Sequence, residues 1–121
     1  MKIDPMTPNK QDRDKILQGE TTEIMTGCGH LYITVNKHGE NPIEVFASLG
    51  KSGSCSKCQM EAITRCISTG LQYGVPLDNF VKQLQGISCP QPSFNGGKDG
   101  RTLSCPDAIS RILANYTKSL T

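Results

Sequence analysis

Cysteine is the residue type that most constrains how this chain can fold. Six of the 121 residues are cysteine, there is no tryptophan, and only 36% of the residues are hydrophobic. A chain of this length is expected to form one domain with a modest core, so it needs a further source of stability. Small proteins commonly obtain it from a bound metal or from cross-links. The six positions are Cys28, Cys55, Cys58, Cys66, Cys89 and Cys105.

Whether the cysteines bind a metal or form disulfides depends on the cellular compartment of the protein. The first residues, "MKIDPMTPNKQDRDK", lack the apolar core of a signal peptide, and no apolar run approaches the roughly 20 residues that span a bilayer. We therefore expect a cytoplasmic protein without a membrane segment, in which clustered cysteines more often bind metal or carry out redox chemistry. The net charge is +2 and the basic residues are scattered, so nucleic-acid binding is not expected.

The hydrophobic pattern predicts a small antiparallel sheet after a flexible tail. Residues 1–19 are polar and aperiodic, so we interpret them as a flexible N-terminal tail before a domain at 20–121. Three β-rich segments follow, at 21–27, 30–36 and 41–50. The second alternates Leu31, Ile33 and Val35 with polar or exposed positions. The third alternates Ile43, Val45 and Ala47 with Glu44 and Phe46, which places Glu44 on the solvent side.

Three helices are predicted after the strands. From about Ser54 to Gln72, Met60, Ile63, Ile67 and Leu71 recur on one face, and Cys66 beside them is expected to be a core residue. A short helix opens at Pro76 and ends before Gly86. The last helix has Ser104 as its cap and buries Ile109, Ile112, Leu113 and Tyr116. The fold class is therefore α+β, with about three strands packed against about three helices.

The stretch "GKSGSC" at residues 50–55 superficially suggests a phosphate-binding loop. The full motif needs a glycine five residues before Gly50, and that position is Val45, within a predicted strand. We interpret residues 50–54 as a turn between strand and helix, with Ser52 or Ser54 as the helix cap.

Five cysteines lie at predicted turns or helix starts, which leaves two chemistries open. Structural zinc takes four thiolate or imidazole ligands in a tetrahedron, commonly on such turns. A Cys-x-x-Cys pair at a helix start can instead act as an exchanging dithiol, because the helix N-terminus lowers a thiol pKa. His30 is a possible replacement ligand. Inert buried thiols are the third alternative.

No acid, base or nucleophile constellation is visible. Glu44, Glu61 and Asp107 have no evident catalytic companion, and Glu61 with Arg65 has the i, i+4 spacing of a surface ion pair. We therefore do not expect the chain to be an enzyme by itself.

Four separated blocks resemble one known family. They are "GCGHLYITVN", "EVFASLGKSGSC" with "MEAITR" after it, "GVPLDNFVKQLQGISCP" and "LSCPDAISRIL". In this order they are similar to the TSCPD domain, which occurs near the C-terminus of adenosylcobalamin-dependent class II ribonucleotide reductases and in small stand-alone proteins. The signature Thr-Ser-Cys-Pro-Asp corresponds to residues 103–107, where Leu103 is the one departure. The resemblance runs from about Glu20 to Leu113.

The resemblance implies a ligand set and a function. It favours Cys28, Cys55, Cys89 and Cys105 as ligands of a structural Zn²⁺ ion, with Cys58 as the substitute. It also implies a role in deoxyribonucleotide synthesis, although the chain is too short to hold the barrel and cobalamin site of such a reductase. We expect a non-catalytic zinc-binding accessory module or split subunit whose partner is a reductase catalytic chain. The alternatives are a dithiol electron carrier using Cys55 and Cys58, and a regulatory or nucleic-acid-binding module, of cellular or phage origin, with zinc as scaffold.

Overall fold

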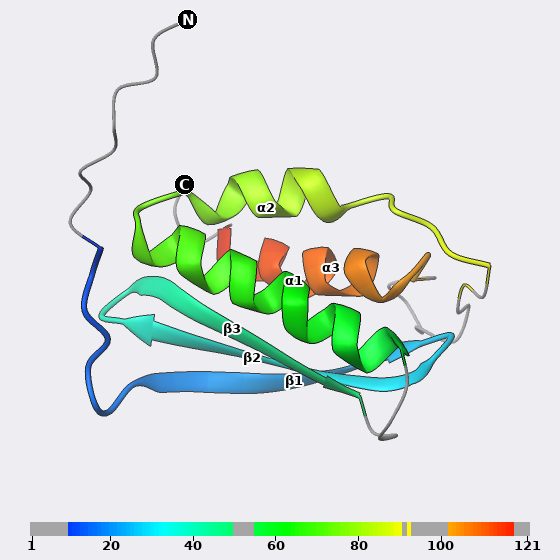
Figure 1. The fold of residues 1–121 in the computed structure, drawn as a ribbon, viewed down its shortest axis with the longest axis horizontal. Coiled ribbons are helices and arrows are strands. Elements are labelled where there is room, and N and C mark those ends of the chain that lie inside the picture. Colours follow the sequence, from blue (N-terminus) through cyan, green and yellow to red (C-terminus); the bar gives the residue numbers. More distant parts are fainter. Residues whose placement is uncertain (1–9, 50–54, 91, 93–101, 118–121) are drawn as a thin grey trace, which may run out of the picture.

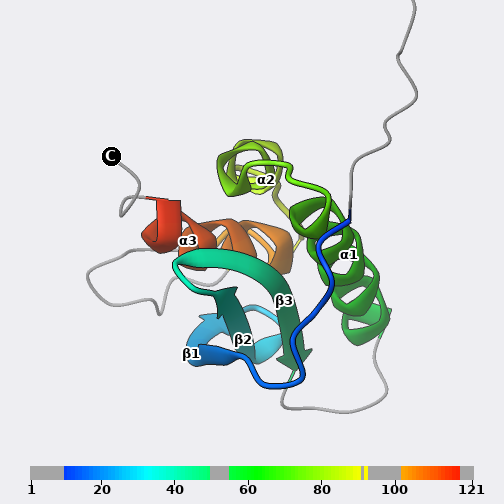
Figure 2. The same ribbon diagram turned by 90° about the vertical axis from the view of Figure 1, so that its left-hand side faces the viewer.

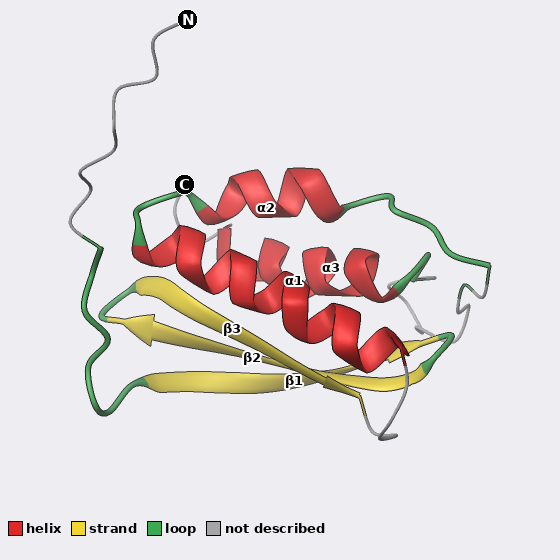
Figure 3. Cartoon of the chain, in the orientation of Figure 1, coloured by secondary structure: helices red, strands yellow, loops and turns green. Residues whose placement is uncertain are grey.

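The computed structural model of the chain describes residues 10–49, 55–90, 92 and 102–117, without the side chain of Cys55. These residues form a three-stranded sheet and three helices, as the α+β prediction required (Figure 3). In chain order the elements are β1 (Gln18–Thr26), β2 (Gly29–His38), β3 (Asn41–Leu49), α1 (Cys55–Gln72), α2 (Leu77–Leu84) and α3 (Cys105–Thr117).

The sheet is an antiparallel meander in the order β1-β2-β3. Thr22 pairs with Ile33 across the first ladder, and Val35 pairs with Val45 across the second. Alternate residues of a strand point to the same side of the sheet, and β2 is the central strand. The Leu31, Ile33 and Val35 side chains therefore form the centre of one face. All three are fully buried, which confirms the predicted alternation of β2.

The helices all lie on one side of the sheet. Figures 1 and 2 show α1 over β3, α3 beside it over the rest of the sheet, and α2 above both helices on the side away from the strands. The opposite face of the sheet carries no helix among the described elements. None of the described helices is both long and apolar enough to cross a membrane.

The core forms between the sheet and the two inner helices. The expected apolar faces are confirmed: Met60 and Ile67 of α1 and Ile109 and Leu113 of α3 are buried, and all pack in one cluster with the β2 side chains. Burying an aliphatic side chain of this size stabilises the fold by about 1.5–3 kcal/mol. The sheet and helices therefore share one core.

Helix α1 is also fixed to the outer edge of β3 through hydrogen bonds. The Ser68 hydroxyl accepts from the backbone N–H of Val45 at 2.9 Å and donates to the carbonyl of the same residue at 3.0 Å. A strand edge normally exposes these groups to solvent or to another chain. Ser68 satisfies them from the helix and fixes the register of α1 against the sheet.

Two expectations about single residues are wrong. Cys66 is exposed and not in the core, because it lies beside the buried stripe of α1 rather than on it. Glu44 is only 3% exposed although strand alternation placed it on the solvent side. Arg13 donates to both of its carboxylate oxygens, at 2.9 and 3.1 Å, and the Asn36 amide donates at 2.6 Å.

Residues before the sheet also contact the domain. The backbone N–H of Gln11 donates to the carbonyl of Gln72 at the end of α1, at 2.8 Å. Asp14 approaches the ring of His38 at 2.7 Å. Together with Arg13, these contacts hold the described part of the predicted tail against β2, β3 and the end of α1.

Candidate metal centre

The turn between β1 and β2 carries the first predicted ligand, Cys28. Two residues connect Thr26 to Gly29, which pair with each other, and Gly29 has the positive φ of 120° that glycine tolerates best. The buried Thr26 hydroxyl donates to the Gly29 carbonyl at 2.8 Å and accepts from the Cys28 N–H at 3.1 Å. A side chain that bonds to the backbone in this way fixes the turn conformation. Thr26 therefore holds Cys28 in one place.

The first turn of α3 brings Cys105 to the same turn. Ser104 caps the helix, as predicted, by accepting from the Asp107 N–H at 3.1 Å. Cys105 is 5% exposed, and its Sγ lies 3.6 Å from the Thr26 hydroxyl. The Thr102 hydroxyl, just before the helix, donates to the Met25 carbonyl at 2.9 Å. The start of α3 is therefore joined to the end of β1.

The pKa of the Cys105 thiol is affected by two neighbouring thiols. Burial raises the pKa of the Cys105 thiol to about 11, the hydrogen bond with Thr26 opposes this, and the neighbouring thiols of Cys28 and Cys89 raise it further. Two of the other predicted ligands, Cys28 and Cys89, therefore lie near the Cys105 thiol. This environment favours the neutral Cys105 thiol, whereas a bound cation would favour its thiolate.

Cys89 is held against the start of α3 by its backbone. Its N–H donates to the Leu103 carbonyl at 3.0 Å. Two residues earlier, the Ile87 carbonyl accepts from the Ser104 hydroxyl at 2.6 Å. The segment that follows α2 thus runs beside the residues that precede Cys105.

The start of α1 completes this end of the molecule. The Cys28 Sγ lies 3.3 Å from the Ser56 hydroxyl in the first turn of α1. In Figure 1 the β1–β2 turn, the starts of α1 and α3 and the segment after α2 all lie at the same end. The fourth predicted ligand, Cys55, begins α1 directly before Ser56, but its side chain lies outside the described residues.

The remaining site predictions have mixed outcomes. Among the described residues, no three Cys, His, Asp or Glu side chains are arranged as a ready metal site, so the four-cysteine set stays a prediction. Cys58, the substitute ligand, is exposed. His30 lies on the open face of the sheet, with its ring 3.3 Å from the Glu23 carboxylate. The turn at 50–54 lies outside the described residues. Glu61 and Arg65 form the expected surface pair at 2.8 Å.

The residues that support the thiols are not among those predicted from the sequence. Thr26 and Ser56 were not identified, although a threonine directly before Gly-Cys-Gly is typical of a side chain that closes a turn. Asp107 was expected only to favour the helix dipole, whereas it is 4% exposed. The Ser-x-x-Asp spacing of a helix start was the available signal.

The environment of Asp107 keeps it ionised in spite of its burial. Burial alone would raise the pKa of the Asp107 carboxyl. Hydrogen bonds from the N–H groups of Leu103 and Gly86 and from the Arg111 guanidinium outweigh this and hold the pKa below the ordinary 3.8. Asp107 is therefore a buried carboxylate whose partners are all donors.

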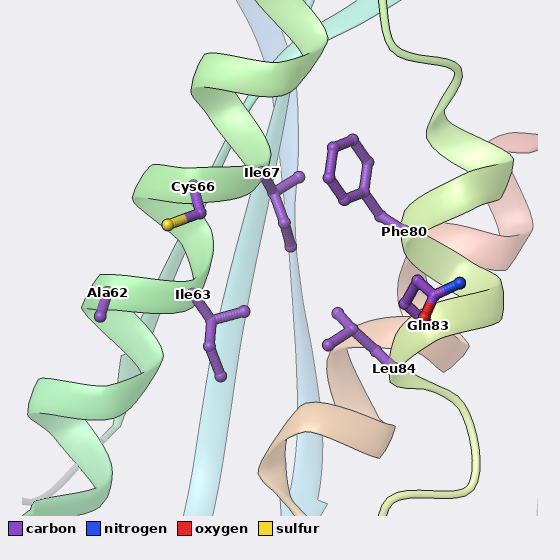
Figure 4. A pocket seen from close by; sticks show the side chains of 7 residues that line it. All are labelled: Ala62, Ile63, Cys66, Ile67, Phe80, Gln83 and Leu84. Atoms are coloured by element: carbon purple, nitrogen blue, oxygen red, sulfur yellow. The ribbon is translucent and has the colours of Figure 1, made fainter. Parts of the chain in front are cut away.

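A second concave feature lies between α1 and α2, apart from the thiols. Figure 4 shows Ile63 and Ile67 of α1 facing Phe80 and Leu84 of α2 across a groove of about 290 Å³. Cys66 lines its rim. The lining is apolar apart from Cys66 and Gln83, and a lone thiol beside an amide is no catalytic constellation.

The comparisons with known proteins agree on one family. A sequence profile for the family described as TSCPD domain matches residues 6–117. Vitamin B12-dependent ribonucleotide reductases from Streptantibioticus cattleyicolor and Streptomyces coelicolor are each 31% identical over 115 residues, which is 93% of this chain. The one from Agrobacterium fabrum is 33% identical over 110 residues, or 86% of the chain.

These relatives are much longer proteins. The chain spans only 19%, 12% and 9% of the three, in the order given. No solved structure matches the chain significantly. The similarity therefore concerns one region of each reductase.

Proposed function

The chain belongs to the TSCPD domain family, and from this premise we propose that it is a non-catalytic accessory module or split subunit of a ribonucleotide reductase. The observation that carries the proposal is the alignment of 93% of the chain with a small part of vitamin B12-dependent ribonucleotide reductases. A region used within such a protein can act on the same catalytic chain when it is supplied separately. Its role would be in deoxyribonucleotide synthesis in the cytoplasm.

We further propose that Cys28, Cys55, Cys89 and Cys105 hold a structural Zn²⁺ ion. The nearness of Cys28 and Cys89 to the Cys105 thiol supports this, as does the contact of Cys28 with Ser56, next to Cys55. When bound, zinc supplies a cross-link between the β1–β2 turn, the segment after α2 and the starts of two helices. Since such a site forms only in the folded chain, the binding free energy adds to folding stability.

The four-thiolate set argues for a scaffold role and not for catalysis. Catalytic zinc keeps a coordination position open for water or substrate, whereas four cysteines fill the tetrahedron. The residues around the thiols are Thr26, Ser56 and Thr102, which tie backbone segments together. We propose that the zinc holds a surface in shape for the reductase partner.

The test of the partner uses a vitamin B12-dependent reductase from which the TSCPD region has been removed. We expect the purified chain to bind this truncated enzyme and to raise its rate of deoxyribonucleotide formation. The matched control is the intact reductase, which already contains the region and should gain nothing. No binding to the truncated enzyme, with zinc-loaded and folded chain, would overturn the partner proposal.

One observation favours a second candidate function. Cys58 is exposed in the first turn of α1, three residues after Cys55, so the Cys-x-x-Cys pair lies at the start of a helix, where exchanging dithiols are found. A dithiol carrier that passes electrons to the reductase would use this pair. Turnover of a disulfide substrate that disappears in Cys58→Ser would support the carrier, and turnover that persists would exclude it.

A further inference from the structure

We propose that Asp107 is a positioning residue that sets Cys89 beside Cys105, an inference that rests on the proposed zinc site. Its carboxylate lies in the first turn of α3 and is 4% exposed. One oxygen, Oδ1, accepts from the Gly86 N–H at 2.9 Å. The other, Oδ2, accepts from the Leu103 N–H at 3.0 Å and from Arg111 Nε at 3.2 Å.

The bond to Gly86 fixes where the segment carrying Cys89 begins. Gly86 follows the last turn of α2 and has a φ of 82°, the left-handed conformation with which a glycine ends a helix. Its N–H is free to point away from α2 and reaches Asp107 on the neighbouring helix. The chain therefore leaves α2 in a direction set by the carboxylate, three residues before Cys89.

The bond to Leu103 fixes the residue to which Cys89 is hydrogen-bonded. The Leu103 N–H donates to Asp107, and the Leu103 carbonyl accepts from the N–H of Cys89 itself. The Asp107 carboxylate thus holds Gly86, which precedes Cys89, and also Leu103, to which Cys89 is hydrogen-bonded. Ser104 adds a third tie through the Ile87 carbonyl at 2.6 Å.

Only a carboxylate satisfies this arrangement. The three groups around Asp107 are two backbone N–H groups and a guanidinium, all donors. An asparagine offers one acceptor oxygen, and its NH₂ group would face a donor that it cannot satisfy. Asp107→Asn therefore keeps the size of the side chain and releases either Gly86 or Leu103, which loosens Cys89 without touching a thiol.

The test measures metal coordination with cobalt(II) in place of zinc, because thiolate-to-cobalt charge-transfer absorption grows with the number of bound thiolates. We expect the unsubstituted chain to show a four-thiolate spectrum. Asp107→Asn should lose about a quarter of that absorption and about 10–100-fold in metal affinity, as is usual when a group that orients a ligand is replaced. Asp78→Asn, at an exposed residue of α2 paired with Lys82, is the matched control and should leave both unchanged.

A double-mutant cycle distinguishes positioning from general damage to the fold. If Asp107 acts through Cys89, Asp107→Asn should cost little further affinity once Cys89→Ser is present. An equal loss in both backgrounds would overturn the inference and leave the zinc site standing. So would an unchanged spectrum in Asp107→Asn. If that variant does not fold, Asp107→Glu, which keeps the charge but moves the carboxylate oxygens away from the Gly86 and Leu103 N–H groups, takes its place in the same cycle.

A measurement without metal separates this inference from the zinc proposal. Amide hydrogen exchange of the Cys89 N–H in metal-free protein should accelerate at least about tenfold in Asp107→Asn, because its acceptor residue is no longer held. Unchanged exchange would overturn the role of Asp107. Failure of the unsubstituted chain to bind cobalt or zinc would overturn the metal site, whatever the exchange shows.

Discussion

The Sγ atom of Cys28 lies 3.3 Å from the Oγ atom of Ser56, so the β1–β2 turn touches α1 at the residue after Cys55. The same turn contacts Cys105 through Thr26. Two segments far apart in the sequence therefore converge on Cys28. If these segments share one metal ion, replacing any one of its cysteine ligands should weaken metal binding.

Serine substitutions should divide the cysteines into two groups. Cys28→Ser, Cys55→Ser, Cys89→Ser and Cys105→Ser should each lose most of the bound zinc and melt at lower temperature, because a removed thiolate leaves the tetrahedron incomplete. Cys58→Ser should keep as much zinc as the unsubstituted chain. Elemental analysis after dialysis measures the zinc, with exposed Cys66→Ser as the control. Loss of zinc from Cys58→Ser together with its retention in Cys55→Ser would place Cys58 in the set instead.

Chelation should destabilise the unsubstituted chain in the same way. At neutral pH, removal of zinc by a chelator should lower the melting temperature sharply, because the metal-binding free energy is lost from the folded state alone. Calorimetry before and after chelation, and after zinc is restored, gives the measurement. A melting curve that chelation leaves unchanged, in protein that contains no zinc by elemental analysis, contradicts the proposed site.

Glu44 should make stability depend on acid pH. Burial alone would raise the pKa of Glu44, but the hydrogen bonds from Arg13 and Asn36 and the charge of Arg13 lower it below the ordinary 4.5. Its contribution to stability is thus present above that value and is lost as the pH falls toward the lowered pKa. In urea unfolding between about pH 3 and pH 7, the free energy of unfolding of Glu44→Gln should fall less on acidification than that of the unsubstituted chain.

Glu61→Gln is the matched control for this measurement. Glu61 also pairs with an arginine, Arg65, but both side chains are exposed, and exposed pairs contribute little to stability. Its pH profile should therefore run parallel to that of the unsubstituted chain. Parallel profiles for Glu44→Gln as well would show that the Arg13 contact does not persist in solution.

Glu44 also shows what the sequence could and could not predict. Composition rich in β-formers identified β1, and period-two alternation identified β2 and β3 and placed Leu31, Ile33 and Val35 correctly, because both signals depend only on neighbouring residues. It placed Glu44 on the solvent side because nothing local identifies Arg13, which lies 31 residues earlier, as its partner. Burial by a distant segment is a tertiary effect, so a local periodic pattern cannot predict it.

In the candidate site, too, local sequence signals were predictive and contacts between distant residues were not. Glycine next to Cys28 and proline next to Cys105 correctly marked a turn and a helix start. The residues that join those turns could not be predicted, since Thr26 meets Cys105 across 79 residues and Asp107 meets Gly86 across 21. A sequence predicts which thiols lie on turns, whereas only the fold shows which of them meet.

Gly70 should resist replacement because of Phe80. A Cβ atom at Gly70 would lie 2.5 Å from the tip of the Phe80 ring, so Gly70→Ala forces the ring out of its place between α1 and α2. Overpacking of this kind costs about 1–3 kcal/mol, against a gain in helix propensity of about 1 kcal/mol. We expect net destabilisation in urea unfolding. In a Phe80→Leu background the same change should become neutral or stabilising, and an equal cost in both backgrounds would show that Phe80 is not the obstacle.

Tyr116 should make stability depend on alkaline pH. Burial, followed by the hydrogen bond to Glu20 at 2.6 Å and the charge of that carboxylate, raises the pKa of Tyr116 to about 12 from the ordinary 10. A raised pKa stabilises the folded state below the ordinary value, and this contribution is lost between about pH 10 and pH 12, as the unfolded chain ionises first.

The stability difference between the unsubstituted chain and Tyr116→Phe should therefore shrink as the pH rises from about 9 to about 11. At neutral pH the loss of a hydrogen bond to a carboxylate should cost Tyr116→Phe about 1.5–3 kcal/mol in the free energy of unfolding. Tyr73→Phe serves as the control, since the Tyr73 side chain is 38% exposed and its ring lies outside the core cluster. A difference for Tyr116→Phe that stays constant over this range would mean that the Glu20 hydrogen bond does not hold the phenol neutral.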